Sequence, residues 1–394
     1  MFLLILLAIL IPILPEKVII GLTISIFLAY GLVRETELRI TGVNPCTSYF
    51  NTLLLAAAIT STMLVGIPRS VIGAAVFLSA FHGERGAIKN IILFTACGLA
   101  YFVYFYHATK QSFSFDYLFF LSLTGALAAS LVESVETKSD KRTTLLLAAA
   151  TTYLIFTIYA LKTTLLELAM AFTIAFALSL AATKSGVADE SGLLSATLIG
   201  TLVIVFTDIR FFLTLLMFYA LGSASTKYRY PIKLQRGIAE PAGGARGYAN
   251  VFSNSLPALF FAINYGFYNY PAFSLAFVAS VAAALGDTMA SEIGKTSEKV
   301  YLITNFKRVP AGVSGGVSLK GEIAAIVGCS IVAIVAAIAG IIDPSGAAIV
   351  LIAGFIGVHI DSILGATLEQ KGLLTNAGVN FFATLSAGLL CLLF

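Results

Sequence analysis

The feature that most constrains the fold of this chain is a series of apolar runs, most of them long enough or nearly long enough to cross a bilayer. The hydrocarbon core of a membrane is about 30 Å thick, so a spanning helix needs about 20 mostly apolar residues. Hydrophobic residues make up 59% of the 394 residues and charged residues only 11%. No water-soluble fold of this length could bury so much apolar surface. The chain is therefore predicted to be a polytopic membrane protein.

The apolar runs show no regular alternation of polar and apolar residues, so they lack the pattern of a β-barrel. Lipid offers no hydrogen-bond partners to backbone N–H and C=O groups, whereas a helix pairs these groups with one another. The sequence therefore predicts an all-α fold, a transmembrane helical bundle of roughly 10–14 membrane segments, some of them short or re-entrant. The predicted segments lie near 2–14, 18–33, 52–64, 70–81, 91–106, 117–135, 144–161, 164–182, 192–206, 210–222, 250–264, 270–286, 322–342, 346–368 and 378–394.

Polar residues divide the chain into two unequal regions. Residues 1–183 have short connections, whereas 184–394 contain two long polar loops, near 223–249 and 287–321. These loops hold ten of the 24 basic residues, and the two apolar segments between them would form a hairpin that returns the chain to the same side. Because Lys and Arg are enriched in cytoplasmic loops, we expect a multi-pass protein of the cell membrane with both loops in the cytoplasm.

Two acidic residues occupy positions where a carboxylate is costly. Asp287 ends the apolar run 270–286, and Asp361 lies inside the run 346–368. An unpaired acid within a bilayer costs at least about 2.5 kcal/mol, so such acids are functional candidates. The alternatives are a capped helix end for Asp287 and a structural pairing with a lysine or a helix terminus for Asp361. Together the two carboxylates would suit Mg²⁺ bound to phosphate oxygens.

A glycine- and serine-rich stretch follows Asp287. Residues 310–321 read Pro-Ala-Gly-Val-Ser-Gly-Gly-Val-Ser-Leu-Lys-Gly. Its backbone N–H groups could cradle an anion, as phosphate-binding nests do, and Lys307, Arg308 and Lys320 bracket it. The stretch is neither a Walker A motif nor a Rossmann fingerprint, so a flexible loop without a ligand stays open as the alternative.

The other polar loop, near 223–249, mixes basic residues with tyrosines. Such a loop beside a membrane span either binds phosphate or only contacts lipid head groups. Asn250 and Asn254 follow it one helical turn apart, and Asn380 is isolated in the last apolar run. Amides in these positions either hold helices together or orient a ligand.

Five blocks of sequence in the second region occur in an order seen in one family of membrane proteins. They lie at 186–200, 225–233, 286–294, 310–321 and 361–367, and asparagines follow at 376–380. Together these blocks resemble the family called domain of unknown function 92, or transmembrane protein 19, although Met289 stands where tryptophan is usual. That family includes the plant phytyl-phosphate kinase of the tocopherol pathway.

The resemblance implies a kinase that transfers a phosphoryl group from CTP or ATP to an isoprenoid monophosphate, giving the diphosphate. Mg²⁺ is the expected cofactor, held by Asp287, Asp361 and Glu292. The same two aspartates, with Lys307 and Arg308, are the expected catalytic residues. The candidate phosphate- and nucleotide-binding residues are Lys227, Arg229, Lys233, Asn250, Asn254, Ser291, Gly312, Ser314, Gly315, Gly316, Ser318, Lys320, Ser362 and Asn380.

Two other functions stay open at this point. One is a cytidylyltransferase that joins a lipid phosphate to CTP, and the other is a transporter of lipids or lipid phosphates. The net charge of +4 is too small to indicate nucleic acid as a partner, so the expected partners are an isoprenoid phosphate lipid and a nucleoside triphosphate. Three roles stay open for residues 1–183: a scaffold, a homodimer surface or an additional lipid channel.

Overall fold

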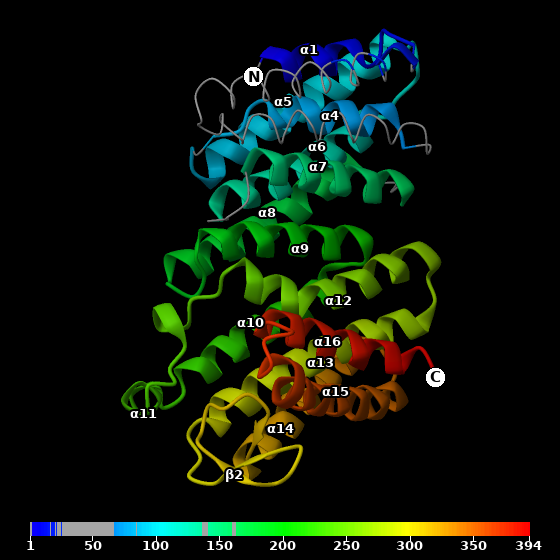
Figure 1. Cartoon of the computed structure of the whole chain (residues 1–394). Helices are drawn as coiled ribbons and strands as arrows, with labels where there is room; N and C mark the ends of the chain where they lie inside the picture. Colours follow the sequence, from blue (N-terminus) through cyan, green and yellow to red (C-terminus); the bar gives the residue numbers. More distant parts are fainter. Residues whose placement is uncertain are drawn as a thin grey trace, which may run out of the picture. The chain divides into compact units, whose positions relative to one another are not determined.

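The computed structural model describes residues 2–15, 17–19, 21, 25, 67–83, 85–135, 141–159 and 163–394. These residues are mostly helical, which confirms the predicted all-α membrane fold (Figure 1). Seven of the described helices are long and apolar enough to cross a membrane, and three further helices are apolar but shorter. The segment predicted near 52–64 and most of that near 18–33 lie outside the described residues.

The chain forms two compact units, Met1–Met170 and Ala171–Phe394. The described helices of the first unit pack closely, as Gly125 illustrates: a Cβ there would come within 2.3 Å of the ring of Tyr153. The bounds of these helices are α1 Phe2–Leu10, α4 Arg69–Ser79, α5 Ala87–Ala108, α6 Phe115–Ser134 and α7 Lys141–Ile158.

The second unit contains the remaining helices. The boundary between the units, at Met170/Ala171, falls within α8, and the division predicted at 183/184 lies at the other end of that helix, where the apolar run ends. Hydropathy alone does not show that the last turns of α8 share a cavity with the next two helices. The bounds are α8 Leu165–Lys184, α9 Glu190–Phe206, α10 Ile209–Lys227, α11 Tyr230–Gln235, η2 Pro241–Gly244, α12 Tyr248–Tyr268, α13 Pro271–Gly294, α14 Leu319–Ile338, α15 Pro344–Leu364, η3 Gly365–Glu369 and α16 Asn376–Cys391.

Helix α13 is the centre of the second unit and packs against α10, α12, α14, α15 and α16. Small residues make this packing close. A Cβ at Gly286 would come within 2.6 Å of the Cys329 Sγ on α14, and a Cβ at Gly354 on α15 would lie 2.9 Å from Ala282 Cβ. Such small residues let helix backbones approach closely in membrane proteins. The apolar core of the unit therefore depends on glycine and alanine along α13.

The predicted polar loops are more ordered than expected. Helix α13 continues two turns beyond Asp287 to Gly294, because small and helix-forming residues follow the aspartate. A three-stranded antiparallel sheet then occupies part of the segment predicted as a loop, in the order β2-β1-β3. Its strands are too short to produce a recognisable sequence pattern: β1 Val300–Leu302, β2 Arg308–Val309 and β3 Gly316–Val317.

Candidate functional site

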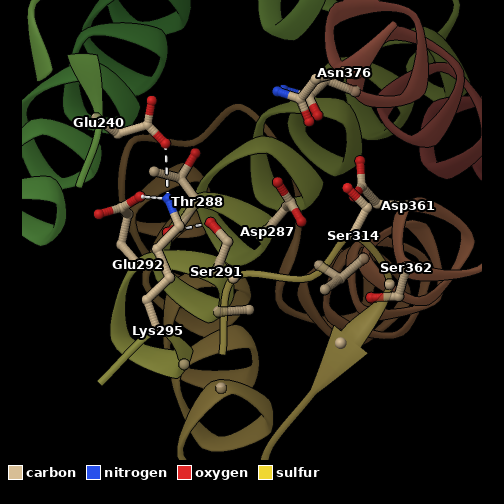
Figure 2. Close-up of a pocket in the computed structure, with 18 of the residues that line it drawn as sticks. Glu240, Asp287, Thr288, Ser291, Glu292, Lys295, Ser314, Asp361, Ser362 and Asn376 are labelled. Carbon is tan, nitrogen blue, oxygen red and sulfur yellow. Dashed lines mark hydrogen bonds and ion pairs between the residues drawn. The ribbon is translucent and has the colours of Figure 1, made fainter. Parts of the chain in front are cut away.

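A polar cavity of about 310 Å³ lies in the second unit (Figure 2). Its wall is formed by residues of α10, α12, α13, α14, α15 and α16, together with residues from both predicted polar loops. Predicted site residues from separate parts of the sequence therefore meet around one space. Thirteen of them line the cavity: Asn250, Asn254, Asp287, Ser291, Glu292, Gly312, Ser314, Gly315, Gly316, Ser318, Asp361, Ser362 and Asn380.

Close helix packing brings Asp287 and Asp361 together. A Cβ at Gly357 on α15 would lie 2.9 Å from Ala283 Cβ on α13. Each aspartate comes four residues after one of these contact positions, which is one helical turn further along the same face. As a result the two carboxyl groups point into the same part of the cavity (Figure 2), and each contributes to the electrostatic environment of the other.

Asn380 supports the Asp361 carboxylate. With its amide oriented so that the nitrogen faces acceptors, Nδ2 donates to Asp361 Oδ2 at 3.2 Å and to the Asn376 carbonyl at 3.2 Å. The amides on α12 have a different partner, because Asn250 Oδ1 accepts a hydrogen bond from Arg246 at 2.5 Å. These asparagines therefore position charged groups in the cavity wall.

The glycine- and serine-rich stretch forms another wall of the cavity. Gly315 has φ +78°, and a Cβ there would come within 2.6 Å of the Ser362 carbonyl oxygen, so only glycine fits. Two groups of the predicted anion cradle have partners within the protein. The Gly316 N–H donates to the Val313 carbonyl at 2.9 Å, and Ser318 Oγ caps α14 by accepting from the Gly321 N–H. The Gly316 N–H is thus already used within the protein, and the Ser318 hydroxyl oxygen is held in place as the cap of α14.

The predicted phosphate-binding cations do not line the cavity. Lys233 is fully buried and forms an ion pair with Glu292, at 2.5 Å between Nζ and Oε2. Arg308 lies in β2 and donates to the Glu298 carbonyl at 3.2 Å, away from the two aspartates. The short sheet holds this part of the loop in place, which a pattern of charges cannot reveal. The cations outside the wall are Lys227, Arg229, Lys233, Lys307, Arg308 and Lys320.

Lys295 is a cavity-lining cation that the sequence analysis missed. Its Nζ lies 2.8 Å from Glu240 Oε1 and 2.6 Å from Glu292 Oε1 (Figure 2). Burial by itself would lower the pKa of Lys295, but the attraction of Glu292 and the hydrogen bonds to both carboxylates outweigh it and raise the pKa. Glu292, predicted as a metal ligand, is thus already held by Lys233 and Lys295.

Arg246 is the second cation that sequence reasoning missed. It is only 7% exposed, and burial lowers the pKa of its guanidinium. The guanidinium lies over the ring of Phe218, with 5.7 Å between Cζ and the ring centroid. A single arginine after the glycines at 243 and 244 was the only sequence signal for this position. The full set of polar wall residues missed is Thr226, Glu240, Arg246, Thr288, Lys295, Glu322, Glu369 and Asn376.

The cavity wall carries more negative than positive charge. Six carboxylates line it, against one arginine and one lysine. Among the described residues, no group of three or more His, Cys, Asp or Glu side chains could hold a metal ion without other ligands. Mg²⁺, however, is usually bound by one or two carboxylates together with substrate phosphates and water. The Asp287 and Asp361 pair fits a metal that arrives with phosphates.

Comparisons with known proteins cover the second unit. Residues 173–388 match the model of the family described as integral membrane protein DUF92. An uncharacterized membrane protein of Synechocystis sp. is 35% identical over 190 residues, which cover 47% of this chain and 74% of the relative. An uncharacterized membrane protein of Methanocaldococcus jannaschii is 30% identical over 58% of this chain and 94% of the relative.

A plant relative also matches this region. The chloroplastic protein VTE6 of Arabidopsis thaliana is 34% identical over 189 residues, which cover 46% of this chain and 57% of VTE6. No solved structure matches the chain. The family model spans more than half of the 394 residues and contains all the sequence blocks on which the resemblance depends. The resemblance is thereby confirmed, and the chain belongs to the DUF92 family of integral membrane proteins.

Proposed function

We propose that this protein is a membrane kinase that transfers the terminal phosphoryl group of a nucleoside triphosphate to an isoprenoid monophosphate. The observation that carries the proposal is the meeting of Asp287 and Asp361, from two helices, in a polar cavity at the ends of apolar helices. The sequence blocks around both aspartates lie within the region that matches the DUF92 model, and they resemble the family that includes a plant phytyl-phosphate kinase, which supports the same assignment.

The wall residues suit phosphoryl transfer, which needs positioning and charge neutralisation more than covalent chemistry. Asp287 and Asp361 would hold Mg²⁺, which would neutralise charge on the donor phosphates. Asn380 would keep the Asp361 carboxylate in place, since its amide donates to Oδ2. Lys295 and Arg246 would supply the fixed positive charges of the wall.

The reaction needs no side chain as a general base. A phosphate monoester has a second pKa of about 6, so its oxygen is largely anionic at neutral pH. An oxygen of the lipid phosphate would attack the terminal phosphorus of the donor, and the bond to the bridging oxygen would break, leaving the nucleoside diphosphate. The products are the isoprenoid diphosphate and that nucleotide, so atoms and charges balance.

We place the protein in the cell membrane with the polar cavity at the cytoplasmic side. Nucleoside triphosphates are cytoplasmic, and the surrounding loops are rich in Lys and Arg, which favour that side of the membrane. CTP and ATP stay equal candidates as donors, because the wall residues named above would contact the phosphates of the donor and none of them would recognise its nucleobase.

Thin-layer chromatography of the reaction products tests the proposal. The protein in lipid nanodiscs would receive farnesyl or geranylgeranyl monophosphate, Mg²⁺, and CTP or ATP labelled at either the terminal or the α-phosphate. We expect lipid diphosphate carrying the terminal label. A CDP-lipid carrying the α-label would identify a cytidylyltransferase instead, and lipid binding without product from either donor would favour transport.

A further inference from the structure

A second cavity in the same unit is apolar. It has a volume of about 70 Å³ and lies between α8, α9 and α10, where its wall includes Leu178, Ala182, Ala196 and Leu215. Leu178 is 39% exposed, so the cavity reaches the outer face of α8. A single water molecule needs about 10–15 Å³ of such space. This cavity therefore has room for a short hydrocarbon segment.

Arg246 joins the two cavities, because it belongs to the wall of both. Its guanidinium is nine-tenths buried, and among the described residues no carboxylate lies within ion-pairing distance of it. Its Nε has no hydrogen-bond partner, and neither does the buried Ser223 Oγ in the wall of the apolar cavity. Burying a cation without a paired anion is costly. The two unpartnered groups indicate that an anionic ligand belongs here.

The chemistry on the two sides of Arg246 is that of an amphiphile with an anionic head. Polar side chains and the two aspartates lie on one side, and aliphatic side chains lie on the other. An arginine binds a phosphate through two parallel N–H donors. We propose that Arg246 binds the phosphate of a prenyl phosphate and that the apolar cavity receives the first carbons of its chain. The rest of the chain leaves along α8 into the bilayer.

This assignment rests on the proposed function for its substrate class, but a binding experiment separates the two. The probe is a farnesyl phosphate analogue with a photoreactive diazirine on its first isoprene unit, added to the full-length protein in nanodiscs. Irradiation and peptide mass spectrometry then locate the labelled residues. We expect labelling within 178–200 and 212–223, the segments that line the apolar cavity. Excess farnesyl phosphate should suppress this labelling. Farnesol or inorganic phosphate, each of which lacks one of the two anchors, should suppress it at least about tenfold less well.

A pair of neighbouring residues on α8 provides matched variants. Ala182 lines the apolar cavity, whereas Ala181 is exposed and does not. Ala182→Leu should fill the cavity and reduce labelling by about tenfold, while Ala181→Leu should leave it unchanged. Equal labelling of the two variants would overturn the assignment of the apolar cavity. So would competed labelling, in the unmodified protein, that is confined to residues outside the wall segments 178–200 and 212–223.

Arg246 is tested by the preference for a phosphorylated lipid. In Arg246→Gln the advantage of farnesyl phosphate over farnesol as a competitor should disappear, and in Arg246→Lys it should be reduced, because the paired donors are lost. An unchanged preference in both variants would exclude Arg246 as the phosphate ligand. Labelling as expected without any phosphoryl transfer would refute the proposed kinase activity and leave this binding site standing.

Discussion

Asp287 and Asp361 are the residues on which the chemistry of the polar cavity depends. They lie on different helices and point into one space, so two ionised carboxylates there would repel each other. The described ion pairs of the cavity engage Glu240 and Glu292 with lysines and Glu322 with His359, and neither aspartate has such a partner. A divalent cation between the two carboxylates would remove this repulsion, which is the physical reason for assigning them to Mg²⁺.

Replacing either aspartate by asparagine should therefore abolish most of the transfer activity. We expect Asp287→Asn and Asp361→Asn each to lower kcat by about 10²–10³-fold, the scale of losing a key electrostatic group in a catalytic site. Asp343→Asn is the matched control, because Asp343 caps α15 outside the cavity and asparagine also caps helices. Activity unchanged in either cavity variant, with normal folding by size-exclusion chromatography, would refute the metal assignment.

The contact between Lys295 and Glu240 predicts a pH dependence of stability. Burial raises the pKa of Glu240, but its hydrogen bond and attraction to Lys295 outweigh this and lower the pKa overall. A lowered pKa stabilises the folded protein above the unfolded value of about 4.3, and this contribution is lost as the pH falls through the folded pKa.

The test compares the Tm of the protein with that of Glu240→Gln over the pH range. The unmodified protein should have the higher Tm at neutral pH, and the difference should shrink as the pH falls below about 4.3. A difference that stays constant down to strongly acidic pH would show that the carboxylate charge of Glu240 does not contribute.

At the scale of single residues, the sequence identifies acids better than bases. Asp287 and Asp361 stand out because their surroundings are apolar, and both line the cavity. Arg246 and Lys295 do not stand out, because they are two of ten basic residues in polar loops. Only the folded loops decide which of these cations turn inward, and their short sheet and helix caps leave no clear pattern in the sequence.

At the scale of elements, the contact between α13 and α15 sets the position of Asp361. A Cβ at Gly357 would lie 2.9 Å from the Cβ atoms of both Ala283 and Ala387. Gly357→Ala should push α15 away from its neighbours and destabilise the protein by about 1–3 kcal/mol, the usual cost of overpacking. Transfer activity should fall with it, because Asp361 follows one turn later.

Gly378→Ala is the matched control for this prediction. Gly378 lies in α16, and its added Cβ would make only ordinary contacts, at 3.5 Å or more. The stability of both variants would be measured by unfolding the protein in mild detergent, with the loss of transfer activity as the readout. Equal stability of Gly357→Ala and Gly378→Ala would mean that α13 and α15 separate without cost.

The elements themselves could be predicted where hydropathy defines them. The apolar runs predicted near 250–264 and 346–368 correspond to α12 and α15. The sequence leaves open whether α13 extends beyond Asp287, because a polar residue after an apolar run is also typical of a loop. The order within the second polar loop was missed, since pairing between strands of two or three residues depends on contacts distant in the sequence.

At the scale of the molecule, the second unit has two chemically different ends. Helix α15 begins near Ser345 and reaches the polar cavity at Asp361. Sixteen residues of helix rise by about 24 Å, most of the thickness of a hydrocarbon core. The N-terminal end of α15 and the polar cavity should therefore face opposite sides of the membrane, with the two polar loops on the side of the cavity.

Labelling of introduced cysteines tests this topology in a background in which the four native cysteines are replaced by alanine. Lys227→Cys and Phe306→Cys place thiols in the two polar loops, where both native side chains are exposed, and Ser345→Cys places one at the exposed start of α15. A maleimide that cannot cross membranes should label the two loop positions only in inside-out vesicles. It should label Ser345→Cys only in right-side-out vesicles. If Lys227→Cys and Phe306→Cys were labelled from opposite sides, the loops could not share a cavity, and the assignment of Asp287 and Asp361 to a cytoplasmic nucleotide would fail.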